Sequence, residues 1–286
     1  MTALARAAGA LPFSDLAVFG EALGALVGGA LRVRRAHVEA SMARAGVRAP
    51  SEAAAGMYAA LGTSALELLW MAGARRDLGA LVRFDASARE AIADARARGA
   101  VFGASHTGNW DLAACAVASS PFGDAQGART PLLVVTKHLS VRFVDAFWQA
   151  ARAGYGVSLA PAGGALARGR ERIAAGGAVA MMIDQVPSRR AHAVETSFLG
   201  ARAWADRAPA TLAARTGAPL VVSASWRDAR GVQEIVALET FAPPARASRA
   251  WIERATASAT EALERFVLAH PTEWLWMHRR WKTPPP

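Results

Sequence analysis

A histidine and a carboxylate stand close together in the string HTGNWD, residues 106–111. His106 and Asp111 are five residues apart, whereas side chains that meet on a regular helix are three or four apart. A turn through Gly108 that leads into a helix can still bring them together. We therefore predict that the Asp111 carboxylate hydrogen-bonds one nitrogen of the His106 imidazole and supports the imidazolium once it forms. The other nitrogen would then accept a proton from an alcohol.

The same string has a purely structural interpretation. Asn109 or Thr107 would cap the following helix, and His106 would be a surface residue without a role. A helix that begins there also presents backbone N–H groups to an oxyanion or a phosphate. For a bare His-x4-Asp pattern the structural interpretation is preferred, but the specific string HTGNWD directly after a strand favours the catalytic one.

The elements that must position these residues alternate between strand and helix. Short apolar runs predict the strands, and longer periodic stretches predict helices between them. The predicted strands are 100–105, 131–137, 157–160, 178–184, 219–226 and 232–239, with 194–200 as an edge strand, and the helices after residue 109 include 140–153, 164–175, 208–216 and 248–269. This order predicts a largely parallel sheet covered by helices. Ligands bind such sheets at the carboxyl ends of the strands, where His106, Asp184 and Gln185 would share one cleft.

The first 98 residues are predicted to be helical, over 14–29, 31–46, 51–73 and 86–98. Residues 11–31 are the most apolar part, but Asp15 and Glu21 interrupt them, and a membrane-spanning helix needs about 20 apolar residues. No convincing signal peptide is present. We expect one domain over 1–286, with this helical part over 1–98 followed by an α/β catalytic part over 99–286.

Three glycines in the apolar segment recur every fourth residue, at positions 20, 24 and 28. A helix face without side chains indicates close contact with another helix, either in lipid or within the same chain. A third interpretation is a helix that lies in the membrane surface, because a basic cluster follows at once, with Arg32, Arg34 and Arg35. Peripheral attachment is favoured over spanning.

Composition limits the remaining possibilities. The 286 residues carry 33 Lys and Arg against 23 Asp and Glu, a formal charge of +10, which favours anionic partners such as nucleic acid, lipid headgroups or phosphorylated substrates. The single cysteine, Cys115, excludes an internal disulfide and a cysteine-based zinc site. Its apolar surroundings indicate a buried thiol and not a nucleophile. Walker A, Gly-x-Gly-x-x-Gly, zinc-finger and RRM patterns are also absent from the sequence.

Several basic and aromatic residues have two interpretations each. Arg189 and Arg190 follow the predicted strand end at Asp184 and would bind a phosphate or lie in a solvated loop. At the C-terminus, tryptophans alternate with His278, Arg279, Arg280 and Lys282, a mixture that suits a lipid headgroup interface, nucleic acid, or tryptophans packed into the core. Ser105 would be a nucleophile only in a serine hydrolase, and Thr at position 107 breaks the Gly-x-Ser-x-Gly pattern.

SHTGNWD resembles the His-x4-Asp/Glu motif of the lysophospholipid acyltransferase superfamily, in the form of its lipid A biosynthesis (lauroyl/myristoyl) branch and of relatives that acylate phosphatidylinositol mannosides. The resemblance extends over nearly the whole chain. It includes RRAHVEASM with the later Glu67, Asp145 with Arg152, GGAVAMMIDQ, FLG (198–200), ATLAARTGAPLV and HPTEWLWMHRRWK. Departures from the family pattern are Asp111 where Glu is frequent, Lys137 near a usual Arg, Ser41 near a usual Asn, and Arg202–Ala205 in place of a Thr- and Gly-rich stretch.

The resemblance implies a glycerol-3-phosphate-acyltransferase-like fold, with a central mixed, mostly parallel sheet covered by helices. It implies transfer of a fatty acyl chain from acyl carrier protein (ACP) or coenzyme A (CoA) to a hydroxyl of a membrane glycolipid, at the cytoplasmic face of the inner membrane. His106 would be the base and Asp111 its partner, with no metal and no cofactor beyond the co-substrate. The residues expected to bind substrate are Asn109, Lys137, Arg152, Asp184, Gln185, Arg189 and Arg190. The alternatives are a serine or His–Asp hydrolase of acyl esters and a basic nucleic-acid-binding protein.

Overall fold

A seven-stranded mixed sheet forms the centre of the computed structural model, which describes residues 1–73, 77–119, 131–137 and 140–284. The strand order is β1-β9-β8-β2-β5-β3-β4, and every neighbouring pair is parallel except β8 and β9. The strands are β1 (Val82–Phe84), β2 (Ala100–Ala104), β3 (Leu132–Thr136), β4 (Ser158–Pro161), β5 (Ala178–Met182), β8 (Leu220–Arg227) and β9 (Gln233–Phe241). The predicted fold, α/β with a mostly parallel mixed sheet, is confirmed.

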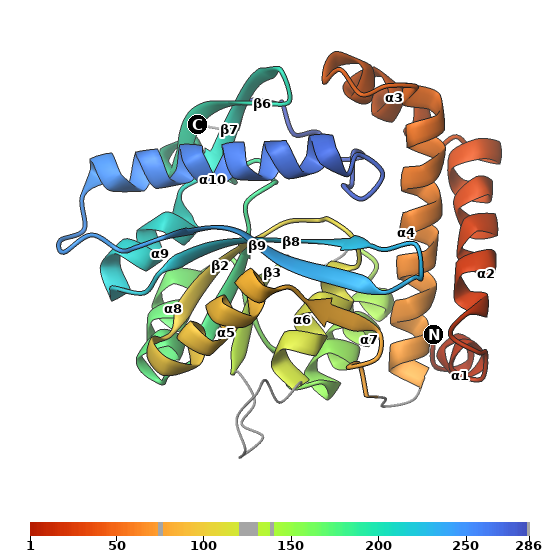
Figure 1. Ribbon diagram of the computed structural model, residues 1–286, viewed down its shortest axis with the longest axis horizontal. Helices are drawn as coiled ribbons and strands as arrows, with labels where there is room; N and C mark the ends of the chain where they lie inside the picture. The colour runs from red at the N-terminus through yellow and green to blue at the C-terminus, as the bar shows by residue number, and fades with distance from the viewer. Residues whose placement is uncertain (74–76, 120–130, 138–139, 285–286) are drawn as a thin grey trace.

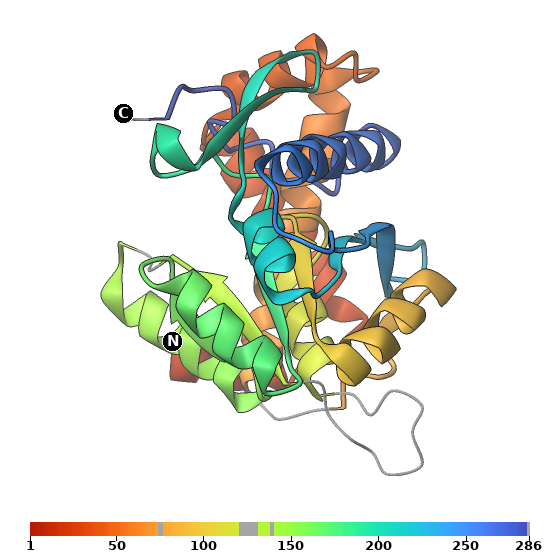
Figure 2. The ribbon, with the colours of Figure 1, turned by 90° about the vertical axis from the view of Figure 1, so that its left-hand side faces the viewer.

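Helices cover both faces of the sheet (Figures 1 and 2). One face packs against α5 (Ala86–Arg98) and α6 (Trp110–Ser119), and the other against α8 (Ala165–Ala174), α9 (Ala208–Thr216) and α10 (Arg249–Ala269). The helix α7 (Arg142–Gly154) lies beside the β4 edge. Residues along each strand alternate between the two faces, so each strand contributes to two separate cores. Phe102 therefore belongs to the core on the α5–α6 side, and its neighbour Val101 to the core on the opposite side.

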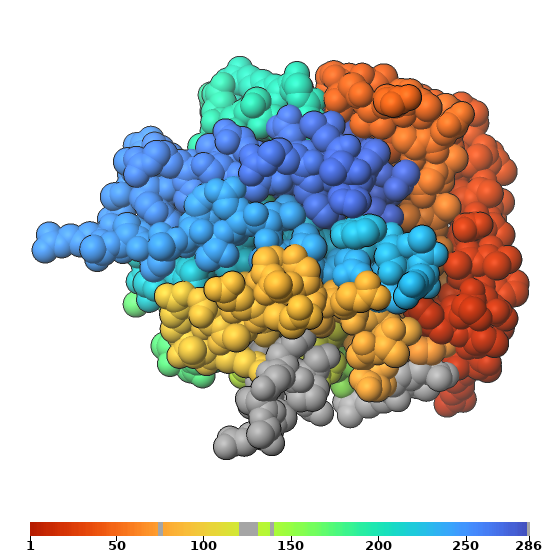
Figure 3. All heavy atoms as spheres, viewed as in Figure 1, coloured from red at the N-terminus to blue at the C-terminus, as the bar shows by residue number. Residues whose placement is uncertain are grey.

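The N-terminal helices form one side of the molecule (Figure 3). They are α1 (Thr2–Gly9), α2 (Asp15–Gly24), which continues into the π-helical segment η1 (Ala25–Ala30), then α3 (Arg35–Arg44) and the long α4 (Pro50–Gly73). The helices α2 and α4 run side by side (Figure 1). Among the described residues, no single helix is long and apolar enough to cross a bilayer, and Asp15–Ala30 and Arg35–Arg44 pass that test only as a pair bent by 92°.

The glycine face of α2 and η1 packs against α4. A Cβ atom at Gly20 would overlap Thr63, and one at Gly24 or Gly28 would overlap the backbone or ring of Tyr58. The spacing of four places all three glycines on one helical face, and their lack of side chains lets the two backbones approach. Of the interpretations of this pattern, close contact within the same chain is therefore the one that the structure shows.

Replacing Gly24 by Ala is expected to lower the free energy of unfolding by about 1–3 kcal/mol, because the new methyl group meets backbone atoms that cannot rotate away. Urea denaturation followed by circular dichroism measures the change. The matched control is Gly29→Ala in the same apolar segment, where an added Cβ has open space, and it should be neutral or slightly stabilising. Equal losses in both variants would contradict the packing argument.

Three expectations about the fold were wrong. The first 98 residues are not entirely helical, because β1 joins the edge of the sheet and α5 packs on it. The helix predicted over 31–46 begins only at Arg35, after two residues in the left-handed region, Arg32 and Arg34. Residues 194–200 are no edge strand of the main sheet: β6 (Ala193–Phe198) pairs only with β7 (Ala201–Asp206), as a separate antiparallel hairpin. The short lengths of these segments left no periodic signal that separates them from loops.

The C-terminal tryptophans are largely a packing element. Trp274 and Trp276 are completely buried in a core formed by α3, α4, α10 and the β6–β7 hairpin, and Trp281 packs against this core. The core interpretation of this segment is therefore confirmed for these side chains. The segment also pairs with the turn that carries His106, since Leu275 N donates to His106 O (3.0 Å) and Gly108 N donates to Glu273 O (2.8 Å).

Candidate active site

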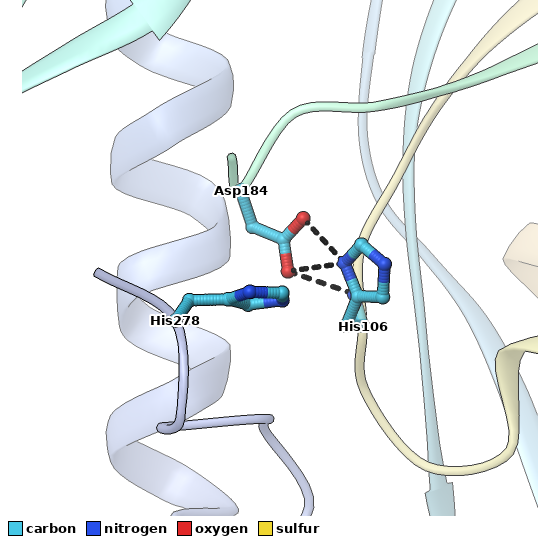
Figure 4. Close-up of side chains that lie close together, drawn as sticks. All are labelled: His106, Asp184 and His278. Carbon is cyan, nitrogen blue, oxygen red and sulfur yellow. Dashed lines mark hydrogen bonds and ion pairs between the residues drawn. The ribbon is translucent and has the colours of Figure 1, made fainter. Parts of the chain in front are cut away.

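His106 and Asp184 lie side by side because the sheet positions them in the same way. The strands β2 and β5 are parallel neighbours with Ala104 opposite Met182, and each of the two residues stands two positions beyond its strand. His106 Nδ1 lies 2.9 Å from Asp184 Oδ1 and 3.1 Å from Oδ2, and the His106 backbone N–H donates to Oδ2 at 2.8 Å (Figure 4). The expected shared cleft at the strand ends is therefore present, with a direct contact between these two residues.

The Asp184 carboxylate is ionised in this environment. It is fully buried, and its Oδ2 also accepts a hydrogen bond from Trp274 Nε1 at 2.9 Å. Burial by itself would raise the pKa of Asp184, but the His106 and His278 imidazoles and the hydrogen bonds from His106 outweigh it, and the pKa lies well below its usual range. Because a carboxylate only accepts, His106 Nδ1 carries the proton of this contact. The Nε2 atom of His106 is then the lone-pair nitrogen that can take a proton from a substrate.

The predicted contact between His106 and Asp111 is wrong. Asp111 is the second residue of α6, and its carboxylate accepts from Arg152 Nε at 2.6 Å and from Trp148 Nε1 at 3.0 Å, both on α7. The helix start turns the Asp111 side chain toward α7, whereas His106 points toward the neighbouring strand end. Asp111 and Arg152 nevertheless both line the same cavity as His106, so the motif supplies two separate groups to one site.

Asn109 is a structural residue, contrary to its predicted role in substrate binding. It is only 2% exposed and caps α6, since its Oδ1 accepts from Leu112 N at 3.0 Å. Its Nδ2 donates to Glu67 Oε2 at 2.8 Å, and Glu67 in turn holds Arg227 through two hydrogen bonds of 2.5 and 2.8 Å. The capping interpretation of this position was therefore correct. Glu67 was found only through its family resemblance, and Arg227 was not singled out by the sequence.

Gly108 allows the turn between β2 and α6. Its φ is 54°, in the left-handed region that glycine adopts without strain. A Cβ there would also come within 2.8 Å of Ser225 O. A side chain at this position would push the turn away from β8, and His106 with it.

Lys137 and Gln185 lie at the mouth of the cavity. Lys137 Nζ donates to Gln185 Oε1 at 3.2 Å, and Gln185 Nε2 lies 3.4 Å from His106 Nε2. Gln185 therefore lies next to the reactive nitrogen, Lys137 contacts Gln185, and both predicted residues line the cavity with His106. Arg189 and Arg190 are exposed on the loop before β6, where the Arg190 guanidinium lies 5.0 Å from the centre of the Trp204 ring. Neither of these two arginines lines the described cavity.

The cavity beneath His106 has a volume of about 540 Å³. Its walls are the face of the sheet that carries Phe102 and Ala180, together with α5, α6 and α7. Many wall residues are alanines, whose small side chains leave the space open; they are Ala88, Ala91, Ala104, Ala113, Ala114, Ala162, Ala180, Ala224 and Ala237. Polar groups lie near the strand ends, with His106, Lys137 and Gln185 among them. An apolar slot with a histidine at its polar end suits a substrate with a long alkyl chain.

Neither candidate nucleophile has the contacts of an activated group. Ser105 Oγ lies 2.9 Å from Thr107 Oγ1, and its second neighbour is Ser223 O at 3.5 Å. Cys115 is completely buried, and burial raises the pKa of its thiol far above the usual range. The predicted inert role of Cys115 agrees with this environment, and no observation on the described residues favours a serine hydrolase.

His278 adds a half-buried, neutral imidazole beside the pair. Its ring centre lies 4.7 Å from that of His106, and burial lowers the pKa of His278 to about 4 (Figure 4). Because the pKa of His278 is lower in the folded protein than in the unfolded chain, the unfolded chain takes up a proton at a higher pH. The free energy of unfolding is therefore unaffected by this group above about pH 6.5 and falls as the pH drops toward about 4.

Between about pH 7 and pH 4.5 the wild type is therefore expected to lose about 2 kcal/mol more unfolding free energy than His278→Gln. Urea denaturation of both proteins in the presence of a chelator measures this difference. His192→Gln, at an exposed histidine, should follow the wild type. If the free energy of unfolding of the wild type and of the His278 variant changed equally with pH, the lowered pKa of His278 would be refuted.

A mostly parallel α/β sheet that carries a histidine–carboxylate pair at the polar end of an apolar cavity can provide a base next to space for an alkyl chain. Residues 2–283 match the family described as bacterial lipid A biosynthesis acyltransferase. The chain belongs to this acyltransferase family, and the resemblance predicted from HTGNWD and the C-terminal segment is confirmed. A search of curated proteins gave no significant match.

Proposed function

We propose that the protein transfers a fatty acyl chain from a thioester carrier, ACP or CoA, to a hydroxyl of a membrane glycolipid of the lipid A or phosphatidylinositol-mannoside type. The observation that carries this proposal is the His106–Asp184 pair at the polar end of the apolar cavity. The pair supplies a base for an alcohol, and the cavity supplies space for the alkyl chain. The family places the reaction among acyl transfers.

In the proposed reaction His106 Nε2 removes the proton from the acceptor hydroxyl as its oxygen attacks the thioester carbonyl. The tetrahedral intermediate then expels the thiolate of the carrier, which takes the proton from His106. Asp184 stabilises the imidazolium between the two steps, as a buried carboxylate does for a catalytic histidine. Base catalysis of this kind contributes about 10²–10⁴-fold to the rate.

Arg152 is the cation that we assign to the developing oxyanion. It lines the cavity, and Asp111 and the neighbouring Trp148 fix its guanidinium from one side. A positive group that is already held in place stabilises charge without reorganising during the reaction. In this proposal Asp111 is a positioning residue that acts through Arg152.

The depth of the cavity sets the length of acyl chain that it accommodates. Leu132 and Thr136, at the two ends of β3, both line it, and four residues of strand span about 13 Å. Carbon–carbon bonds of about 1.5 Å advance an extended chain by roughly 1.25 Å per carbon, so about ten carbons fit along this length of the cavity. A medium-length acyl chain is therefore the proposed donor group.

Ala180→Leu is expected to shift the preferred acyl chain to a shorter one by about three carbons, because the larger side chain occupies the space of three methylene groups in the slot. Ala180 lines the cavity at the level of Phe102 and Val134. Relative kcat/KM for acyl donors of increasing length measures the shift. Ala174→Leu, on the exposed side of α8, should leave the preference unchanged. An unchanged preference in Ala180→Leu would exclude this wall as part of the acyl slot.

We infer that the N-terminal helices attach the protein to the cytoplasmic face of the inner membrane. Large apolar side chains are exposed along α1, α2, η1 and the residues that follow; they are Leu4, Val18, Phe19, Leu26, Leu31 and Val33. Exposed Arg32 and Arg34 alternate with the last two of these. Apolar side chains next to cations are typical of a surface that binds anionic lipid headgroups.

An acyl-transfer assay tests the proposed function. Purified protein is incubated with radiolabelled acyl-ACP or acyl-CoA, with and without vesicles that contain the glycolipid acceptor. Transfer predicts loss of label from the donor only with acceptor, appearance of label in the lipid, and loss of both in His106→Ala. Loss of label without acceptor that is abolished in Ser105→Ala would instead indicate a hydrolase.

A further inference from the structure

Three side chains with metal-binding atoms meet at the strand ends. His106, Asp184 and His278 each offer one ligand atom within 4.8 Å of the others. Figure 4 shows the Asp184 carboxylate facing the His106 ring, with the His278 ring below the carboxylate. His106 and Asp184 follow β2 and β5, and His278 comes from the C-terminal segment that packs against them. The tertiary structure therefore assembles two nitrogen donors and one oxygen donor from three separate parts of the chain.

His278 has a nitrogen without a partner. Its Nε2 atom is buried and makes no hydrogen bond with the described residues. A buried polar atom without a partner costs about 1–3 kcal/mol, and such atoms mark places where a water, an ion or a substrate group belongs. The His106 imidazole and the Asp184 charge are neighbours of this ring, as are the Trp274 ring and the Arg280 and Arg34 charges, and a ligand of this nitrogen could lie between the three side chains of the cluster.

We propose that His106, Asp184 and His278 bind one divalent transition-metal ion of the zinc class. Two imidazole nitrogens and one carboxylate oxygen form a typical three-residue zinc set, which leaves a fourth position for water. His106 and His278 line the cavity, so the fourth position opens toward it. Zinc bonds of about 2.0–2.1 Å place tetrahedral ligands about 3.4 Å apart, so the cluster must contract by roughly 1.4 Å when it binds the ion.

The surroundings hold the ligands in orientation. Trp274 Nε1 donates to Asp184 Oδ2 at 2.9 Å, and the His106 backbone N–H donates to the same oxygen. His37 Nε2 lies 3.1 Å from His278 O and so fixes the backbone of the third ligand to α3. Outer contacts of this kind orient metal ligands and raise affinity. The His278 Nε2 atom has no hydrogen-bond partner among the described residues, so rotation of this ring toward the ion would break no bond of that atom.

Binding of the ion blocks the base. The ion replaces the proton on His106 Nδ1, and this proton is released to water. The imidazole and the Asp184 carboxylate then bind the metal and no longer hydrogen-bond to each other. The imidazole can no longer cycle between neutral and protonated forms. This consequence rests on the proposed function, since it predicts reversible inhibition of acyl transfer, whereas metal binding itself does not depend on it.

Metal binding is tested on the purified full-length protein after removal of metals by a chelator. Cobalt(II) titration followed by visible absorption, and zinc competition against a chromophoric chelator, should each show one bound ion per chain. We expect His278→Ala to weaken zinc binding at least tenfold, and His106→Ala likewise. His192→Ala, at an exposed histidine outside the cluster, is the matched control and should bind as the wild type does.

Two further measurements make the outcome independent of any variant. Anomalous X-ray scattering from crystals grown with zinc should locate the ion between the three side chains. Zinc should also inhibit acyl transfer, and a chelator should restore it; binding without inhibition would leave the site intact and contradict the proposed role of His106. The absence of stoichiometric binding at millimolar zinc, or binding that survives both histidine substitutions, would overturn the proposal.

Discussion

Asp184→Asn is expected to lower kcat by about 10⁴-fold, as the loss of the carboxylate does in other histidine–carboxylate pairs. The amide carries no charge to stabilise the imidazolium. The amide also has only one oxygen that accepts hydrogen bonds, whereas three N–H groups from His106 and Trp274 donate to the two oxygens of Asp184. The His106 ring would then lose its fixed tautomer. Single-turnover measurement of acyl transfer to the glycolipid acceptor gives the rate of this step without product release.

Asp111→Asn is the informative comparison, because sequence reasoning assigned it the role that the structure gives to Asp184. Asp111 contacts Arg152 and Trp148 and not His106, so its substitution should lower the rate while the acid limb of the pH–rate profile stays in place. Asp184→Asn should move that limb, since it removes the charge next to the base. A shifted limb in Asp111→Asn together with an unshifted one in Asp184→Asn would reverse the assignment.

Glu67→Ala is expected to lower the free energy of unfolding by about 3–5 kcal/mol, the usual effect of removing one partner from a buried ion pair. The Glu67 carboxylate is 1% exposed and accepts from both terminal nitrogens of Arg227 and from Asn109. Its removal takes the hydrogen-bonded carboxylate away from the largely buried Arg227 guanidinium and frees the residue that caps α6. Urea denaturation of the variant and the wild type measures the loss.

Two further variants separate this buried pair from ordinary surface charges. Glu253→Ala breaks the exposed pair with Arg249 on α10 and should change stability by no more than about 0.5 kcal/mol. The double variant Glu67→Ala with Arg227→Met should be more stable than Glu67→Ala alone, because it also removes the guanidinium that Glu67→Ala leaves without its hydrogen-bonded carboxylate. A double variant less stable than either single one would show that the network acts through packing and not through charge.

The surface proposed to contact the membrane and the candidate active site are linked through Arg34, which precedes α3, and through His37 on α3. Exposed Arg34 donates to Met277 O at 2.8 Å, one residue before His278, and His37 contacts His278 itself. Residues 31–34 alternate exposed apolar and basic side chains, which is the pattern proposed here for lipid contact. The segment that would meet the membrane therefore also holds the C-terminal segment against the His106–Asp184 pair.

The sequence determined the class of fold and the position of the reactive centre. Apolar runs of strand length, separated by helical stretches, predict the parallel sheet, and the residues directly after those runs predict its functional edge. His106, Asp184, Gln185 and Lys137 were found in this way or by family resemblance. Asp184 lies at His106 Nδ1, Gln185 lies near His106 Nε2, and Lys137 contacts Gln185. Periodicity and strand ends are local properties, so one sequence suffices to show them.

Only the tertiary structure decided which side chains touch. Strand order is set by long-range packing. Because β2 and β5 are neighbours in the sheet, His106 contacts the carboxylate of Asp184 and not that of Asp111, which is nearer in the sequence. The same holds for His278, which reaches the site because the buried tryptophans anchor the C-terminal segment between α4 and α10. It also holds for the cavity, since the space left by its alanines exists only where α5, α6 and α7 meet the sheet. Contacts between residues distant in the chain depend on the balance of burial over the whole molecule, which no short stretch of sequence contains.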